Sequence, residues 1–332
     1  MAKQRGFRWR SVWVVTAWAL GVALLAAAGL FWPAGPVDHV VARSWALAAD
    51  DLPADPAAEQ PMGEVLSAGY GHETVWVRLR VDPGLTRDRA GEALLLRIRP
   101  GYLDDIVVFD PLAGGAPIGP VGDRHPLAAQ ARPSTVFNLA LAPGEQPREI
   151  RVRLRSQSTR LAHFEVLREH DLWRADAHST VWGALYLAAL TTLLVWGGAQ
   201  LLVRRDALAV SFIALQAASL AYGACSLGFL HLFVAPGADV LWIDRLTSVM
   251  AITATGAGFA FNALLLREMQ MPRWGRWLAL GGLLLFPGLL VLQAVGHTVP
   301  ALRLNMLLVL LGPVVFLLMA LASPLGIAGQ PV

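Results

Sequence analysis

The sequence is poor in cysteine, in lysine and in charged residues of any kind. Because Cys225 is the only cysteine, no disulfide can form within the chain, so a domain outside the membrane must be stable through its hydrophobic core alone. Lys3 is the only lysine. Charged residues make up 15% of the 332 residues and hydrophobic residues 55%, a composition too apolar for an ordinary soluble protein.

Long uncharged runs account for this composition. Residues 11–32 follow four positive charges and predict a signal peptide or signal anchor over residues 1–32, with a possible cleavage site at Ala26-Ala27-Ala28. Five further runs are each about 20 residues or longer, which is enough for a helix to cross a hydrocarbon core of about 30 Å. They predict a helical transmembrane bundle over residues 179–325, with spans near residues 180–203, 207–234, 246–266, 277–296 and 304–323.

The excess of positive charge lies beside these runs. The chain has a formal net charge of +3, yet residues 33–179 hold 16 arginines against 20 acidic residues. Basic residues beside membrane spans are retained on the cytoplasmic side. If residues 33–178 are extracytoplasmic, nine of the remaining eleven basic residues lie on the cytoplasmic side. We therefore expect a multi-pass protein of the bacterial inner membrane, with residues 33–178 periplasmic and a short cytoplasmic tail over residues 326–332. The lipid bilayer is an expected partner, whereas no basic stripe with interleaved aromatic residues points to nucleic acid.

Residues 33–178 show the alternation of β-strands. Between residues 73 and 81 every second residue is Val or Leu, a period of two that predicts a half-buried strand. The same pattern predicts strands at residues 94–99, 106–109, 136–141, 149–155 and 162–167, and residues 33–62 are expected to form a lead-in strand or loop. Because Pro-Gly and Gly-Gly pairs separate these strands and no helical period intervenes, we expect an extracytoplasmic antiparallel β-sandwich.

These segments resemble a known family. The soluble motifs are Glu73-Thr-Val-Trp-Val-Arg-Leu, Leu94-Leu-Leu-Arg-Ile, Leu103-Asp-Asp-Ile-Val-Val-Phe, Gly122-Asp-Arg-His-Pro, Val136-Phe-Asn-Leu and Ile150-Arg-Val-Arg-Leu-Arg-Ser. Those of the membrane half are Tyr186, the Arg204-Arg205-Asp206 turn, Tyr222 with Gly228, and residues 261–267. Over about residues 60–320 the chain resembles bacterial seven-transmembrane receptors with diverse intracellular signalling modules (7TMR-DISM), with the second of that family's two extracellular sensor types.

The resemblance implies a cleaved leader, a jelly-roll-like sensor similar to carbohydrate-binding modules, and a bundle of seven helices. It also implies a cytoplasmic output, commonly a diguanylate cyclase or a histidine kinase. The chain departs from this pattern, because five spans follow the sensor and no signalling module follows the fifth. We expect either a truncated member of the family or a receptor that signals through a separate partner.

Candidate ligand-binding residues combine aromatic rings with charged groups. A sugar needs an aromatic platform for its apolar face and carboxylates or guanidinium groups for its hydroxyls. The residues that offer both are Trp45, Trp76, Arg78, Tyr102, Asp104 and Asp105. The competing interpretation is structural: Trp76 belongs to the core or to a sheet face, and Arg78 to an ordinary solvated strand face.

Polar residues inside the predicted spans are the other candidates, since they mark either a pathway or interhelical hydrogen bonds. They are Gln216, His231, Asn262, Gln293 and Asn305. We expect no metal site, because the histidines and acids at His163, Glu165, His170, Asp171 and His178 match no compact zinc or copper spacing. No cofactor motif occurs. Ser226 has no base in reach on its helical face, because His231 is five residues away, so we expect no enzyme.

The sequence thus predicts a non-catalytic membrane receptor. A small extracytoplasmic ligand, a carbohydrate or another polar molecule by family resemblance, would bind the sandwich and change the packing of the bundle. The alternative is an accessory or anchoring protein of the envelope whose sandwich docks another protein. A transporter is a third hypothesis, which the absence of intramembrane charge and of visible inverted repeats disfavours.

Overall fold

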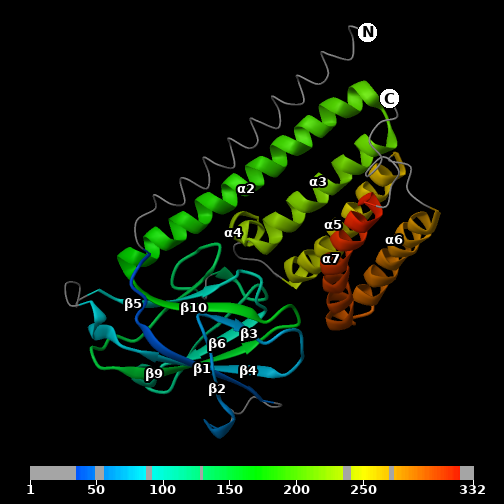
Figure 1. Cartoon of the computed structure of the whole chain (residues 1–332). Coiled ribbons are helices and arrows are strands. Elements are labelled where there is room, and N and C mark those ends of the chain that lie inside the picture. The colour runs from blue at the N-terminus through cyan, green and yellow to red at the C-terminus, as the bar shows by residue number, and fades with distance from the viewer. Residues whose placement is uncertain are drawn as a thin grey trace. The chain divides into compact units, whose positions relative to one another are not determined.

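A computed structural model describes residues 35–48, 56–86, 92–127, 130–234, 241–268 and 273–321. Two antiparallel sheets occupy residues 40–168, and five helices long and apolar enough to cross a membrane follow in the described part of the chain (Figure 1). The chain is therefore a mixed membrane protein, as predicted. The predicted leader over residues 1–32 and the predicted tail over residues 326–332 lie outside the described residues.

The strands of residues 40–168 divide between the two sheets. The first sheet has the order β2-β1-β4-β9-β6-β7 and the second β3-β10-β5-β8. The strands are β1 Val40–Ala48, β2 Gln60–Pro61, β3 Val65–Ser67, β4 Thr74–Val81, β5 Leu94–Arg99, β6 Asp105–Phe109, β7 Pro117–Val121, β8 Phe137–Ala140, β9 Arg148–Arg155 and β10 Leu161–Arg168. Short 3-10 helices lie at η1 Pro56–Ala58, η2 Pro83–Leu85 and η4 Pro111–Ala113. The chain changes sheet at most connections, as in jelly-roll sandwiches.

The six strands predicted from alternation are confirmed as β4, β5, β6, β8, β9 and β10. Strand β7 was not predicted, because Pro117-Ile-Gly-Pro-Val121 contains two prolines and a glycine and lacks alternation. It is the last strand of its sheet and pairs only with β6 among the described strands. An edge position tolerates proline because its missing N–H costs no ladder hydrogen bond.

The sandwich core lies between the two sheets. Val75, Val77 and Leu79 of β4 and Ile98 of β5 are at most 1% exposed and belong to one hydrophobic cluster. Burial of an aliphatic side chain contributes about 1.5–3 kcal/mol. The free cysteine, Cys225, lies in α3 and not in this core.

The membrane half contains six described helices. They are α2 Glu169–Arg204, α3 Ala207–Ser226, α4 Phe229–Phe233, α5 Leu241–Glu268, α6 Arg273–Ala294 and α7 Thr298–Leu321. Helix α2 packs against α3, α3 against α5, and α5 against both α6 and α7. At the centre, the ring of Phe259 lies 5.1 Å from the rings of both Phe286 and Phe316.

Two helix boundaries differ from the predicted spans. Helix α2 begins at Glu169, directly after β10, so the predicted domain boundary at residue 178 falls inside a continuous helix. The predicted span over residues 207–234 is divided at Gly228, whose φ of 76° is left-handed and ends the helical geometry between α3 and α4. Hydropathy cannot register this break, because Leu227 and Phe229 on either side of it are apolar.

Candidate functional site

The sandwich is joined to the first long helix through one buried arginine. Arg97 of β5 is 2% exposed, and its guanidinium donates to Asp176 Oδ1 at 2.7 Å and to Ser179 Oγ at 2.6 Å on α2. It also donates to Glu165 Oε2 of β10 at 2.8 Å. Asp176 accepts two further hydrogen bonds from the sandwich, from Ser134 and Asn138.

This network fixes the start of α2 on the second sheet. A buried charge is costly unless it is paired and hydrogen-bonded, and Arg97 meets two carboxylates, a hydroxyl and the carbonyl oxygen of Ala175. Strand β10 continues into α2 without a loop (Figure 1). The start of α2 is therefore connected to β10 through the chain itself and to β5 through hydrogen bonds.

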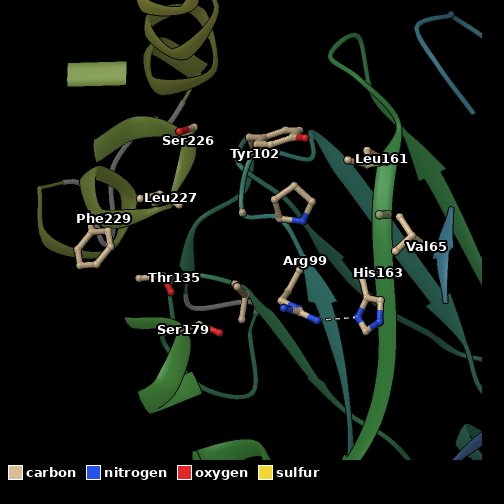
Figure 2. A pocket seen from close by; sticks show the side chains of 14 residues that line it. Val65, Arg99, Tyr102, Thr135, Leu161, His163, Ser179, Ser226, Leu227 and Phe229 are labelled. Atoms are coloured by element: carbon tan, nitrogen blue, oxygen red, sulfur yellow. Dashed lines mark hydrogen bonds between the residues drawn. The ribbon is translucent and has the colours of Figure 1, made fainter. Parts of the chain in front are cut away.

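A cavity of about 470 Å³ lies beside this network. Its walls come from the sandwich and from the helices: Arg99, Tyr102 and His163 on one part, Ser179, Ser226 and Phe229 on the other (Figure 2). Most of the lining is apolar, with a few polar side chains placed among it, as is typical of small-molecule sites.

The charged groups of this cavity sit on two neighbouring strands. Arg99 Nη2 of β5 donates to His163 Nδ1 of β10 at 2.9 Å, as Figure 2 shows, and to Glu165 Oε1 at 3.3 Å. Burial lowers the pKa of His163, partly offset by the carboxylate of Glu165. Burial also lowers the pKa of Arg99. The cavity wall therefore carries a guanidinium beside an imidazole whose Nδ1 accepts a hydrogen bond from it.

Two glycines let a sandwich loop reach the break between α3 and α4. A Cβ on Gly101 or on Gly228 would lie 2.4 Å from the carbonyl oxygen of Thr135. Gly228 also needs its left-handed φ. Neither position can accept a larger residue without movement of the backbone. The helix break and the sandwich loop are therefore matched surfaces, that is, two backbone segments that fit closely against each other.

A second connection joins the sandwich to α5 and α7. Arg124, in the turn after β7, donates to Asp244 Oδ2 of α5 from Nη2 at 2.7 Å and from Nε at 3.0 Å. Arg303 of α7 donates to the backbone oxygen of Tyr70. The sandwich thus contacts both the first and the later helices of the bundle.

A family model covers the sandwich. Residues 42–168 match 7TMR-DISM extracellular 2. Five apolar helices follow this domain among the described residues, an arrangement consistent with a 7TMR-DISM receptor. No curated protein matches the chain. The resemblance that the motifs indicated is therefore confirmed for the sensor, and an extracellular sensor family followed by membrane-capable helices suggests a membrane receptor.

The ligand-binding residues predicted from the sequence do not form one site. Trp45 pairs with Val77 and packs on the core, whereas Trp76 and Arg78 lie on the opposite face of the same sheet. Trp76 is 8% exposed and its ring lies 5.6 Å from that of Phe109, so little of its face is open to a sugar. Arg78 pairs with Glu59 at 2.5 Å and with Glu149 at 3.5 Å.

The remaining three predicted residues lie at the start of β6 or just before it. Asp105 accepts from Arg153 at 3.3 Å and its Oδ1 lies 2.8 Å from His125 Nε2. Asp104 is buried and accepts from Ser156 Oγ at 2.5 Å. Tyr102 lines the cavity beside Arg99 and also a second one against α5 and α7, and burial raises its pKa. Of the predicted set, Tyr102 is the residue placed at a cavity between sandwich and helices.

Sequence reasoning missed Arg97, Arg99, Asp176 and the pair Arg124–Asp244. One signal was present: Arg97 interrupts the otherwise apolar run 94–98, and a charge inside such a strand needs a partner. Two of the three histidines considered as metal ligands have other contacts, since His163 Nδ1 accepts from Arg99 and His178 Nε2 accepts from Trp182 Nε1 at 2.7 Å.

The polar residues predicted inside the spans are dispersed over five helices. Asn262 donates to the backbone oxygen of Gly258 at 2.8 Å. Buried oxygen or nitrogen atoms of Gln216, His231, Gln293 and Asn305 have no hydrogen-bond partner among the described residues. Asn305 differs from the others in lining the second cavity together with sandwich residues.

Proposed function

We propose that this protein is a non-catalytic receptor of the bacterial inner membrane, whose periplasmic sandwich binds a carbohydrate or another small polar molecule. The observation that carries the proposal is the cavity of about 470 Å³ beside Arg99, whose walls belong to both the sandwich and the helices. A molecule in this cavity contacts both parts at once. It can therefore favour one relative arrangement of them over another.

The chemistry of the cavity supports a ligand with hydroxyl or carboxylate groups. Arg99 supplies donors, His163 supplies its Nε2 N–H as a donor because its Nδ1 accepts from Arg99, and Ser179 and Ser226 supply hydroxyls. Tyr102 and Phe229 supply aromatic surface for an apolar face. This set replaces Trp45, Trp76 and Arg78 as the proposed binding residues, since those three lie on two faces of the other sheet.

The transmission step follows from the Arg97 network. A ligand shifts an equilibrium only by its differential affinity for the two states. Arg97 and Arg99 lie on the same strand, so a movement of β5 that accompanies binding at Arg99 also moves the groups that hold Asp176 of α2. We infer that α2 carries the signal to its cytoplasmic end, where a diguanylate cyclase or histidine kinase module reads it.

The binding test uses the full chain in lipid nanodiscs. Calorimetric titration against a panel of neutral sugars, amino sugars and sugar acids should find at least one that binds. The variant Arg99→Gln should weaken that binding at least tenfold, because it removes the charged donor of the cavity. The control Arg80→Gln changes an exposed arginine of the other sheet and should leave the affinity unchanged.

Two results would overturn the proposal. One is silence across the panel together with a stable stoichiometric protein partner, which would favour the accessory role. The other is binding that Arg99→Gln leaves intact. Transmission is tested separately: Asp176→Asn should preserve sugar affinity and abolish sugar-dependent changes in hydrogen exchange of α2.

A further inference from the structure

A second cavity, of about 220 Å³, lies where the sandwich meets α5 and α7. Asp123 reaches it from the turn after β7, Asp244 and Ser248 from α5, and Asn305 from α7. Next to it stands Asp104, and one carboxylate oxygen from each of Asp104, Asp123 and Asp244 lies within 4.8 Å of the others.

The charges of this cluster are not balanced. Arg124 Nη2 contacts Asp104 Oδ2 at 3.2 Å and Asp244 Oδ2 at 2.7 Å, and it is the positive group that the described structure places among the three carboxylates. Three carboxylates and one guanidinium leave two negative charges when all are ionised. Buried charges in proteins are paired or coordinate metals.

Asp123 is the carboxylate that Arg124 leaves without a contact. It is 3% exposed, and its Oδ1 is buried without a hydrogen-bond partner in the described part of the chain. By contrast Asp104 accepts from Ser156 Oγ and from the backbone N–H of Gln157. The free-energy cost of burying the unpaired carboxylate of Asp123 falls if a cation is bound beside it.

Asn305 gives an independent indication of a ligand. It lies on α7, outside the acidic cluster, is 7% exposed, and its Oδ1 has no hydrogen-bond partner among the described residues although it lines the same cavity. An unsatisfied buried acceptor costs about 1–3 kcal/mol. A carbonyl oxygen beside carboxylates is the donor type that hard divalent cations prefer, and the cavity has room for bound waters.

We propose that Asp123, Asp244 and Asn305, with Asp104 beside them, bind a hard divalent cation, Ca²⁺ or Mg²⁺, between the sandwich and the helical bundle. A divalent cation supplies the two missing positive charges. Its ligands come from a sandwich turn, α5 and α7, so the bound cation fastens the sensor to the later helices as Arg97 fastens it to α2. The second cavity shares Tyr102 with the proposed sugar cavity, but none of the proposed cation ligands lines the sugar cavity, and the cation proposal does not depend on it.

The experiment uses the full chain in nanodiscs after treatment with EDTA, in the absence of sugars. Titration with CaCl₂ or with MgCl₂ should show saturable binding of one equivalent and an upward shift in the thermal midpoint. The affinities measured in the two titrations decide which of the two cations the site prefers. Tb³⁺ should bind in place of Ca²⁺ and show sensitised emission, because Tyr70, Tyr102 and Tyr222 line the cavity.

The variants separate binding from folding. Asp123→Asn should weaken cation binding at least tenfold and reduce Tb³⁺ emission, and in EDTA it should be at least as stable as the unchanged chain because it removes a buried unpaired charge. Asn305→Leu should also weaken binding. The control Glu64→Gln removes an exposed acid of the sandwich and should change neither quantity.

The absence of a stoichiometric cation, or binding that both Asp123→Asn and Asn305→Leu leave unchanged, would overturn the site. A fall in stability of Asp123→Asn in EDTA would also count against it. That result would give Asp123 a structural role in the cation-free protein. Sugar binding is measured with other variants, so either proposal can fail while the other stands.

Discussion

At the scale of single residues, the charged side chains of the sandwich differ in burial and in role. Arg97 and Arg99 are two positions apart on β5 and face the same side, but their surroundings differ. Arg97 is 2% exposed and fully engaged with α2 and β10, whereas the Arg99 side chain is 39% exposed and lines a cavity. The first position is suited to holding the helix and the second to meeting a ligand.

Replacement of Arg97 tests the first role. Arg97→Met should lower the free energy of unfolding by about 3–5 kcal/mol. The substitution removes the buried guanidinium and leaves the carboxylates of Asp176 and Glu165 without its hydrogen bonds and charge. Arg80→Gln, on an exposed site, should change it by less than about 0.5 kcal/mol. Thermal or denaturant unfolding of the two variants in detergent measures the difference, and equal small effects would contradict the assignment.

The lowered pKa of His163 predicts a pH dependence of stability. The unfolded chain binds a proton near the ordinary value of 6.5, and the folded chain only at a lower pH, so stability falls as the pH drops through this window. The groups that act on His163 are Glu165 and Asp38, which favour its protonation, and Arg99 and Arg43, which oppose it.

His163→Gln should therefore lose less stability between pH 8 and pH 5.5 than the unchanged chain. Thermal midpoints at the two pH values measure this loss. The exposed His170 offers the matched control, since His170→Gln should keep the full dependence. A dependence that His163→Gln retains in full would show that other groups cause it.

At the scale of elements, alternation and charge-free runs located the strands and helices, but not their ends. Strand β10 runs directly into α2, where no turn residue separates the two periods. The α3–α4 break depends on one backbone conformation at Gly228 and on the close approach of Thr135. Neither feature leaves a mark in hydropathy.

Substitution of Gly228 tests the matched surfaces at this break. Gly228→Ala should destabilise the protein by more than the roughly 1–2 kcal/mol of a left-handed alanine, since the new Cβ would also meet Thr135. Gly288→Ala in α6 is the matched control: no atom lies within 4 Å of its Cβ position, and its φ is not left-handed. The control should be neutral or stabilising. Equal thermal midpoints for the two variants would contradict the assignment.

At the scale of the whole molecule, the distribution of arginine predicts which ends of the helices face the cytoplasm. Arg205 lies at the turn between α2 and α3, away from the β10–α2 junction by the full length of α2. Arg303 of α7 instead contacts the backbone oxygen of Tyr70 in the sandwich, and Arg124 of the sandwich contacts Asp244 of α5. Two of the basic groups on the outer side are thus explained by their partners.

Cysteine labelling tests this topology. In a Cys225→Ala background, Glu149→Cys on the exposed face of β9 should react with a membrane-impermeant maleimide in cells whose outer membrane is permeable to it. Arg205→Cys should react only after the inner membrane is opened. Labelling of Arg205→Cys in intact spheroplasts would reverse the predicted orientation.

The sequence by itself determined the two halves of this protein, because strand alternation, span length and charge asymmetry depend on residues close together in the chain. It also indicated the sensor family. Only the tertiary structure decided which polar residues meet. Trp45 and Trp76 were separated by the strand register, which sends them to opposite faces of one sheet. Arg124 and Asp244 are 120 positions apart, and Asn305 joins them on a third element, so packing alone assembles the proposed cation site.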